Sequence, residues 1–204
     1  YYLKKIMNDK DKYKDDKINL GNQYNKYIYP KPYIELKNNY INYDPKLFWN
    51  RLWPENSFKE SGLKILVAGC GANQASVLAY NNPNHQFVGI DISSESIKNN
   101  EKIVSKYKLK NLELICDDFR LINFDYKFDL IFSSGVIHHL KDPLTALIYF
   151  ENILSDDGVI ALMVYGKYER YGINQVKKIF KKLKLKQDND SINIAKKIID
   201  NLNH

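Results

Sequence analysis

Short apolar runs alternate with polar segments through the middle of the chain. The run Ile65–Ala68 is apolar throughout, which is typical of a strand buried on both faces of a parallel sheet. Four further runs predict strands at 87–91, 112–116, 128–134 and 159–165. Helical patterns lie between them, so the order of elements predicts an α/β fold with a mostly parallel sheet.

Local signals mark where two of the helices begin. Ser94-Glu95-Ser96 places serine caps and an acid in a first helical turn, and this helix is predicted to run to about Tyr107. Asp142-Pro143 combines an N-cap residue with proline at the first helical position. Residues 155–158 are predicted to form the turn that leads into the fifth strand.

The first strand is followed by a glycine turn and a helix. Gly69 and Gly71 end the apolar run, and a helix is predicted to begin at Gln74. A strand, a bare turn and a helix N-terminus together favour nucleotide binding, although a tight structural turn has the same local pattern. The second strand, Phe87–Asp91, ends in an acid that suits a ribose diol.

Gly69-Cys70-Gly71 with Asp91 resembles the first two motifs of the class I S-adenosylmethionine-dependent methyltransferases. The resemblance covers about residues 64–165, and the Val-Ala-Gly-Cys-Gly variant is similar to a bacterial subgroup often joined to tetratricopeptide repeats. It implies a Rossmann-like, doubly wound sheet in the order 3-2-1-4-5, S-adenosyl-L-methionine as cofactor, and methyl transfer. Val67 replaces the acid usual before the turn, and Asn73 replaces the third glycine.

The same resemblance implies a set of cofactor-binding residues. An Asp after the third strand accepts the adenine amino group in this family, and Asp118 fits that register better than Asp117, with Phe119 packing on the ring. Two acids after a strand also suit a plain turn. The whole set implied is Gly69, Cys70, Gly71, Gln74, Asp91, Ile92, Asp118, Phe119, Ser133 and Ser134.

Two adjacent histidines follow the fourth strand. Ligands of open α/β sheets bind outside the carboxyl ends of the strands, so His138 and His139 are expected on the active face. Histidine titrates near neutrality, which makes either one a candidate general base. The alternative is that they pack or orient the loop. Four histidines spread along the chain do not predict a metal site.

The N-terminal part is polar and rich in tyrosine. Residues 1–17 are expected to be a poorly ordered or weakly helical lead-in, and 23–33 an extended segment with two prolines. That segment resembles one found ahead of the core in the same subgroup. It suits a lid in which Tyr24 or Tyr29 faces the sulfonium, or plain surface packing. Residues 47–53 predict an aromatic helical turn that ends at Pro54 and packs on the sheet or lines a substrate wall.

The pattern changes again after Gly166. A lysine-rich amphipathic helix begins near Tyr171, and a second short helix is predicted from Ile192 to Leu202. A solvated face is favoured over a binding site for the lysines. The family's sheet has seven strands and five are recognised, so the last two are either absent from this piece or replaced. The predicted domains are a lead-in and lid over 1–60, a core over 61–165 and a helical, truncated segment over 166–204.

Composition narrows the remaining choices. The chain has 204 residues, 44% of them hydrophobic, and a net charge of +7. Abundant Lys, Asn, Ile and Tyr suit compositional drift better than a nucleic-acid site, and no stretch predicts a membrane span or a signal peptide. The two cysteines, Cys70 and Cys116, are expected one whole strand apart, which favours a reducing cytoplasm. The first residue is Tyr, which suits a trimmed piece of a longer protein.

Three functions remain open, in a stated order. The leading one is a methyltransferase that acts on an unidentified small-molecule or protein acceptor. A non-catalytic module that binds the cofactor is second, because Val67 replaces an acid and two strands are missing. An NAD-linked oxidoreductase is third, because its fingerprint requires glycine where Gln74 stands.

Overall fold

The computed structural model describes residues 13–36, 44–53, 58–186 and 188–202. It divides into two compact units, Tyr1–Val164 and Tyr165–His204. The predicted lead-in over residues 1–12 lies outside the described residues, as does Pro54.

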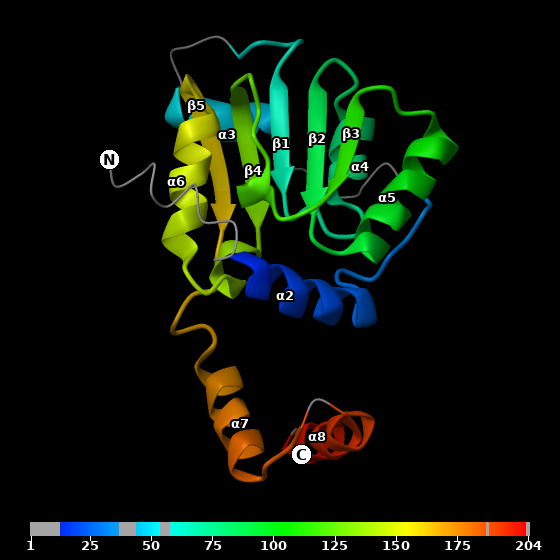
Figure 1. Cartoon of the computed structure of the whole chain (residues 1–204), viewed down its shortest axis with the longest axis vertical. Helices are drawn as coiled ribbons and strands as arrows, with labels where there is room; N and C mark the ends of the chain where they lie inside the picture. Colours follow the sequence, from blue (N-terminus) through cyan, green and yellow to red (C-terminus); the bar gives the residue numbers. More distant parts are fainter. Residues whose placement is uncertain (1–12, 37–43, 54–57, 187, 203–204) are drawn as a thin grey trace. The chain divides into compact units, whose positions relative to one another are not determined.

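The first unit is built on one parallel sheet. Its five strands are β1 (Lys64–Ala68), β2 (Gln86–Asp91), β3 (Leu112–Cys116), β4 (Phe128–Ser134) and β5 (Leu154–Met163). They lie in the order β3-β2-β1-β4-β5, and every neighbouring pair is parallel. The predicted Rossmann-like fold and its strand order are therefore confirmed (Figure 1).

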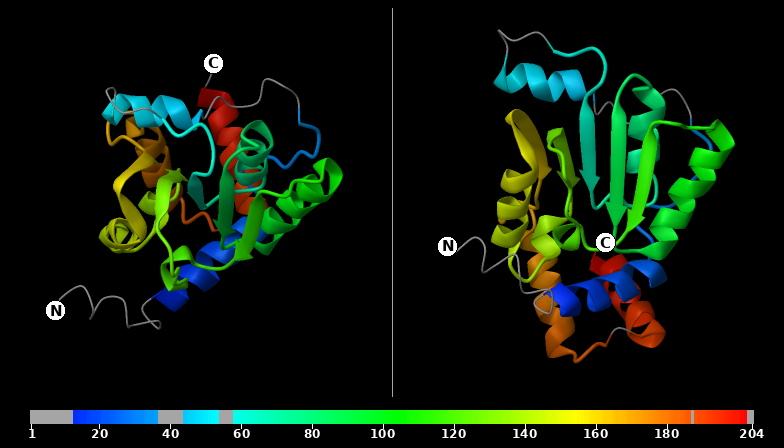
Figure 2. Two further views of the ribbon diagram at one scale, coloured as in Figure 1. Left: turned by 90° about the horizontal axis from the view of Figure 1, so that it is seen from above. Right: turned by 45° about the horizontal axis from the view of Figure 1, so that its top comes forward.

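Helices cover both faces of the sheet. On one face, α3 (Pro45–Leu52), α4 (Gln74–Asn81) and α5 (Ser94–Tyr107) pack over a core that includes Val67 and Phe132. On the other face, α6 (Pro143–Ile153) packs over Leu66 and Ile131. Seen from above, α3 and α6 lie on opposite sides of the strands (Figure 2). Alternate residues of one strand thus feed two separate cores, as expected of a parallel sheet buried on both faces.

The N-terminal helix α2 (Lys14–Lys26) differs from the prediction. The tyrosine-rich segment was expected to be extended from residue 23, but residues 23–26 form the last turn of α2. The side chains that face the sheet recur at helical spacing, at Tyr13, Lys17, Gly21 and Tyr24. This helix passes across the carboxyl ends of the strands in both views (Figures 1 and 2).

The fifth strand also begins earlier than predicted. Residues 155–158 were expected to form a turn, but β5 starts at Leu154, which pairs with Phe128. The register then shifts, so that Leu130 pairs with Val159. The four polar and glycine residues between are taken up by this irregularity within the strand instead of by a separate turn.

The aromatic turn before the core does pack on the sheet. Trp49 of α3 is buried in the core, and the ring of Phe48 meets that of Phe132 edge-on at 5.3 Å. Trp53 donates its indole N–H to the carbonyl of Asp157 at 3.0 Å. The packing role predicted for residues 47–53 is therefore confirmed.

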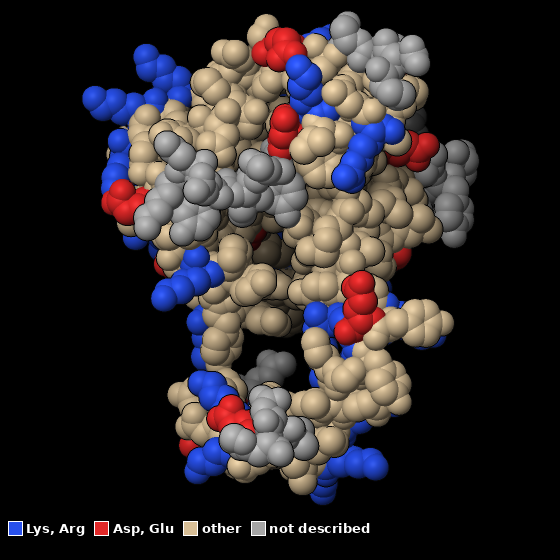
Figure 3. Space-filling view, turned by 180° about the vertical axis from the view of Figure 1, so that it is seen from behind, with Lys and Arg blue, Asp and Glu red and all other residues tan. Residues whose placement is uncertain are grey.

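The second unit contains α7 (Tyr171–Lys182) and α8 (Asn189–Leu202). Both predicted helices are present, and α8 begins three residues before the predicted Ile192. Within this unit, the guanidinium of Arg170 lies 3.9 Å from the centre of the Tyr165 ring. On the face drawn in Figure 3, Lys and Arg are scattered and not gathered into one patch.

Candidate functional site

The glycine turn after β1 requires glycine at two positions. Gly69 has φ +73° and Gly71 has φ +55°, in the left-handed region that favours glycine. A Cβ on Gly69 would lie 2.3 Å from Cγ2 of Val136. A Cβ on Gly71 would lie 3.1 Å from Cδ of Pro30. The turn therefore has no room for side chains, whatever it binds.

Asp91 links the end of β2 to this turn. Its Oδ2 accepts the N–H of Gly71 at 2.7 Å, and its Oδ1 accepts the N–H of Ser93 at 2.8 Å. Burial raises the pKa of the Asp91 carboxyl, and these backbone hydrogen bonds partly oppose the rise. A carboxylate has about four acceptor positions, so two remain beside the turn. That arrangement fits a ribose diol.

Two asparagines of α5 hold the turn from behind, and the sequence gave no signal for either. Asn100 donates to the carbonyl of Gly71 at 2.8 Å, while its Oδ1 accepts the N–H and the hydroxyl of Ser76. Asn99 donates to the carbonyl of Ala72 at 2.9 Å. With these carbonyls engaged by α5, the turn is held in a single conformation.

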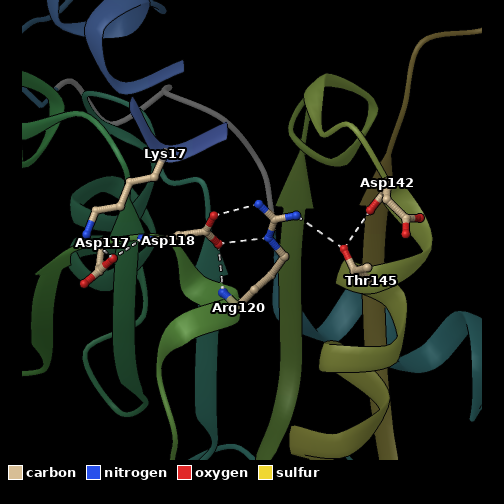
Figure 4. A network of polar contacts seen from close by, with 6 residues as sticks. All are labelled: Lys17, Asp117, Asp118, Arg120, Asp142 and Thr145. Carbon is tan, nitrogen blue, oxygen red and sulfur yellow. Dashed lines mark hydrogen bonds and ion pairs between the residues drawn. The ribbon is translucent and has the colours of Figure 1, made fainter. Parts of the chain in front are cut away.

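The acids after β3 lie in a network with charged partners (Figure 4). Lys17 of α2 lies 2.8 Å from Asp117 Oδ1. Both oxygens of Asp118 accept from the guanidinium of Arg120, which also donates to Thr145 at 3.3 Å. The adenine role predicted for Asp118 stays a prediction, and it leaves that carboxylate only its unused lone pairs.

Phe119 and the serines of β4 differ in their surroundings. Phe119 is buried and stacks on Phe150, with ring centres 5.2 Å apart. Ser133 is fully buried, and its hydroxyl has no hydrogen-bond partner among the described residues. Ser134 is half-buried at the end of the strand. Ser133 therefore keeps an unused polar group beneath the active face.

The two histidines lie together on the short helix η3 (Ile137–His139). Their Nε2 atoms are 3.1 Å apart, and the ring of His139 meets that of Tyr24 at 6.1 Å. Tyr24 thus reaches the active face from α2. The Tyr29 side chain is instead 71% exposed, although its backbone lies against Gly71.

The remaining predicted residues contribute unequally. Cys70 points into the core, where burial raises the pKa of its thiol, so only its backbone can face a ligand. Gln74 begins α4 and is half-buried. The carbonyl of Ile92 lies 3.4 Å from a Cβ placed on Gly21 of α2. The structure gathers all of these residues along the carboxyl edge of β1–β4.

Two further searches were made over the part of the chain that the structure describes. Cys70 and Cys116 are free thiols, with β2 lying between their strands. Among the described residues, no three His, Cys, Asp or Glu side chains come together as a metal site. None of the described helices combines the length and apolar character needed to cross a bilayer.

Known proteins share this sequence pattern. Residues 59–202 match the family model described as a methyltransferase domain. Malonyl-[acyl-carrier protein] O-methyltransferase 2 of Ilyobacter polytropus is 30% identical over 144 residues, 69% of this chain and 54% of that protein. The tRNA (guanine-N(7)-)-methyltransferase of Christiangramia forsetii is 27% identical over 128 residues, 57% of each chain.

Solved structures share the fold. PKMT2 from Rickettsia typhi, in complex with AdoHcy, is 23% identical, with a TM-score of 0.58 over 68% of this chain and 28% of that one. A second PKMT2 structure gives a TM-score of 0.61 at 22% identity, over 78% and 32% of the two chains.

The matched part of this chain spans 54% and 57% of the two curated relatives named above. The family model, by contrast, covers well over half of the present sequence, from ahead of β1 into α8. With the glycine turn, Asp91 and the parallel sheet in their expected places, the chain belongs to the methyltransferase-domain family.

Proposed function

We propose that this protein is an S-adenosylmethionine-dependent methyltransferase that acts on a small-molecule or protein acceptor. The observation that carries the proposal is the contact between Asp91 and Gly71. It joins the ribose-type acceptor at the end of β2 to the bare turn at the end of β1, and it leaves two acceptor positions available.

Several residues would hold the cofactor. Asp91 would accept the ribose hydroxyls, the turn at Gly69 and Gly71 would let the ligand approach the backbone, and Asp118 with Phe119 would face the adenine. The bound cofactor supplies an electrophilic methyl group on a sulfonium. Helix α2 covers this edge of the sheet, so it would exclude water and align the acceptor.

The histidine pair supplies the candidates for proton transfer. With their Nε2 atoms 3.1 Å apart, one nitrogen must accept if the other donates. One ring can therefore receive a proton from an acceptor that carries one, while the other orients it. The alternative, that the pair only orders the loop beside Tyr24, is tested by His138→Gln and His139→Gln.

A non-catalytic cofactor-binding module is the second candidate. It is favoured by Val67 in place of the usual acid and by a sheet of five strands among the described residues. The third candidate, an NAD-linked oxidoreductase, is disfavoured by Gln74.

Calorimetric titration followed by turnover distinguishes these candidates. S-adenosylmethionine and S-adenosylhomocysteine are titrated first, with NAD as the control ligand. Release of S-adenosylhomocysteine is then measured with acceptors of the classes named for the relatives, a malonyl-carrier protein and tRNA, and with small amines and peptides. Binding with turnover supports the methyltransferase, binding without turnover on any acceptor supports the module, and tight NAD binding supports the oxidoreductase.

The finer assignment rests on the resemblance. The Val-Ala-Gly-Cys-Gly run favours the bacterial subgroup often joined to tetratricopeptide repeats, and the free thiols favour a cytoplasmic location. Scattered basic side chains disfavour a dedicated nucleic-acid surface.

A further inference from the structure

Asn73 stands at the N-cap of α4, yet its side chain does not cap that helix. An N-cap asparagine ordinarily accepts an N–H from the first helical turn. Here the N–H of Ser76, in that turn, is accepted by Asn100 Oδ1 at 3.2 Å. Because another helix supplies the cap, the Asn73 amide is available for a different contact.

That contact is with the strap, which we define as residues 27–36, between α2 and the next undescribed segment. Asn73 Oδ1 accepts the N–H of Tyr33 at 3.3 Å, and its Nδ2 donates to the carbonyl of Lys31 at 3.2 Å. The side-chain amide therefore pairs with the strap backbone as a peptide group of a neighbouring strand would.

Asn99 secures the same junction from α5. Its Nδ2 lies 2.8 Å from Asn73 Oδ1, 2.9 Å from the Ala72 carbonyl and 3.0 Å from the Tyr33 carbonyl. Two hydrogens serve three acceptors, so at least one is shared. Asn73 and Asn99 are 2% and 7% exposed, and a buried polar junction is costly to break. We call these two side chains the clasp.

The strap that the clasp holds lies directly against the glycine turn. A Cβ on Gly71 would be 3.1 Å from Pro30 Cδ and 3.3 Å from the Tyr29 carbonyl. Further along, Leu36 donates its N–H to the hydroxyl of Tyr107 on α5 at 2.9 Å. The strap thus follows the α4–α5 side of the site.

The adenine is expected on the opposite side. Phe119 belongs to the core beneath α6, on the other face of the sheet from α4 and α5. With the ribose at Asp91 between the two, the amino-acid half of the cofactor would extend toward the glycine turn and the strap. This step rests on the proposed function.

We infer that Asn73 and Asn99 are positioning residues, which hold the strap against the glycine turn as a wall for the amino-acid half of the bound cofactor. Asn73 occupies the position where the family has a third glycine, so the clasp depends on that departure from the motif.

The experiment compares two ligands on the same variants. S-adenosylhomocysteine carries the amino-acid half, and 5′-methylthioadenosine lacks it. We expect Asn73→Gly to weaken S-adenosylhomocysteine about tenfold, or ~1.4 kcal/mol, for the lost pair of hydrogen bonds, and to change 5′-methylthioadenosine less than about threefold. Hydrogen exchange of the strap should slow on addition of S-adenosylhomocysteine in the wild type and not in Asn73→Gly.

A matched control is available at the other end of the sheet. Asn111 is also buried, and its Nδ2 donates to the carbonyls of Ala79, Asn82 and His85. Asn111→Ala should lower thermal stability without changing either affinity. Tyr33→Pro removes one clasp hydrogen bond and leaves both asparagines in place, so it tests the inference if Asn73→Gly does not fold.

The outcomes separate the two proposals. If the wild type does not bind S-adenosylhomocysteine, the proposed function is overturned. If the wild type binds and Asn73→Gly binds equally well, or loses both ligands to the same extent, the clasp is overturned and the proposed function stands.

Discussion

Asp118 and Arg120 form an ion pair that is almost completely buried beneath α2. Nη2 of Arg120 lies 2.7 Å from Oδ2 of Asp118, and Nε lies 3.0 Å from Oδ1. Their side chains are 2% and 3% exposed, and the ring of Tyr13 covers the guanidinium at 4.1 Å. The pair therefore connects the loop after β3 to the N-terminal helix (Figure 4).

Removing one partner of this pair should be strongly destabilising. Arg120→Met leaves the Asp118 carboxylate buried without its counter-charge, and we expect the free energy of unfolding to fall by ~3–5 kcal/mol. Urea denaturation measures the change. Lys17→Met is the control, because its ion pair with Asp117 is largely exposed and should cost less than ~1 kcal/mol. Equal losses in the two variants would contradict the distinction.

The close contact between Gly69 and Val136 predicts a steric effect beyond backbone strain. Gly62 has a similar φ of +80° but nothing within 4 Å of a placed Cβ, so Gly62→Ala should cost only the strain, ~1–3 kcal/mol. Gly69→Ala should cost clearly more, because its Cβ would meet Val136 at 2.3 Å. Thermal unfolding compares the two. Val136→Ala, added to Gly69→Ala, should recover part of the difference, and no recovery would rule out the clash.

Asp91 should dominate the affinity for the cofactor. Asp91→Ala removes the acceptor for the ribose hydroxyls, so we expect S-adenosylhomocysteine binding to weaken by at least ~1–3 kcal/mol in calorimetric titration. Asp129→Ala is the matched control. Asp129 also accepts a backbone N–H, that of Lys64 at 2.9 Å, but it lies at the start of β4, at the opposite edge of the sheet. Unchanged affinity in Asp91→Ala would remove Asp91 from the site.

His85 should make stability depend on pH. It is buried, and burial lowers its pKa below the usual value near 6.5. The unfolded chain therefore binds the proton more readily, so the stability contributed by His85 is complete above about pH 6.5 and is lost as the pH falls toward the folded pKa.

His85→Gln tests this dependence. Glutamine does not titrate and can still accept the N–H of Leu63, which lies 3.4 Å from Nδ1 of His85. The free energy of unfolding, measured in urea between pH 7.5 and 5, should fall less steeply in the variant than in the wild type. Parallel slopes would show that other groups cause the loss.

Local signals in the sequence were sufficient for most of the elements. The apolar run before Gly69, the serine cap at Ser93–Ser94 and the Asp142-Pro143 pair each act within about one turn of chain. The parallel sheet and its order followed from these elements and from the family resemblance. The irregular start of β5 was missed, because its polar residues pattern as a turn when the neighbouring β4 is not in view.

The candidate site was predictable only where one short stretch supplies it. Gly69, Gly71 and Asp91 follow from two motifs, and the structure joins them by one hydrogen bond. The Asp118 side chain was predicted as an adenine acceptor, but its occupation by Arg120 depends on burial under Tyr13, more than a hundred residues earlier.

The sequence by itself determined the strands, the glycine turn and the acid at the end of β2, because hydrophobic period, caps and backbone permissiveness are properties of a few adjacent residues. Tertiary structure decided the course of α2 across the sheet, the clasp of Asn73 and Asn99 on the strap, and the partner of Asp118. Those contacts are polar and directional, and their partners meet only after the chain has folded, so no local pattern encodes them.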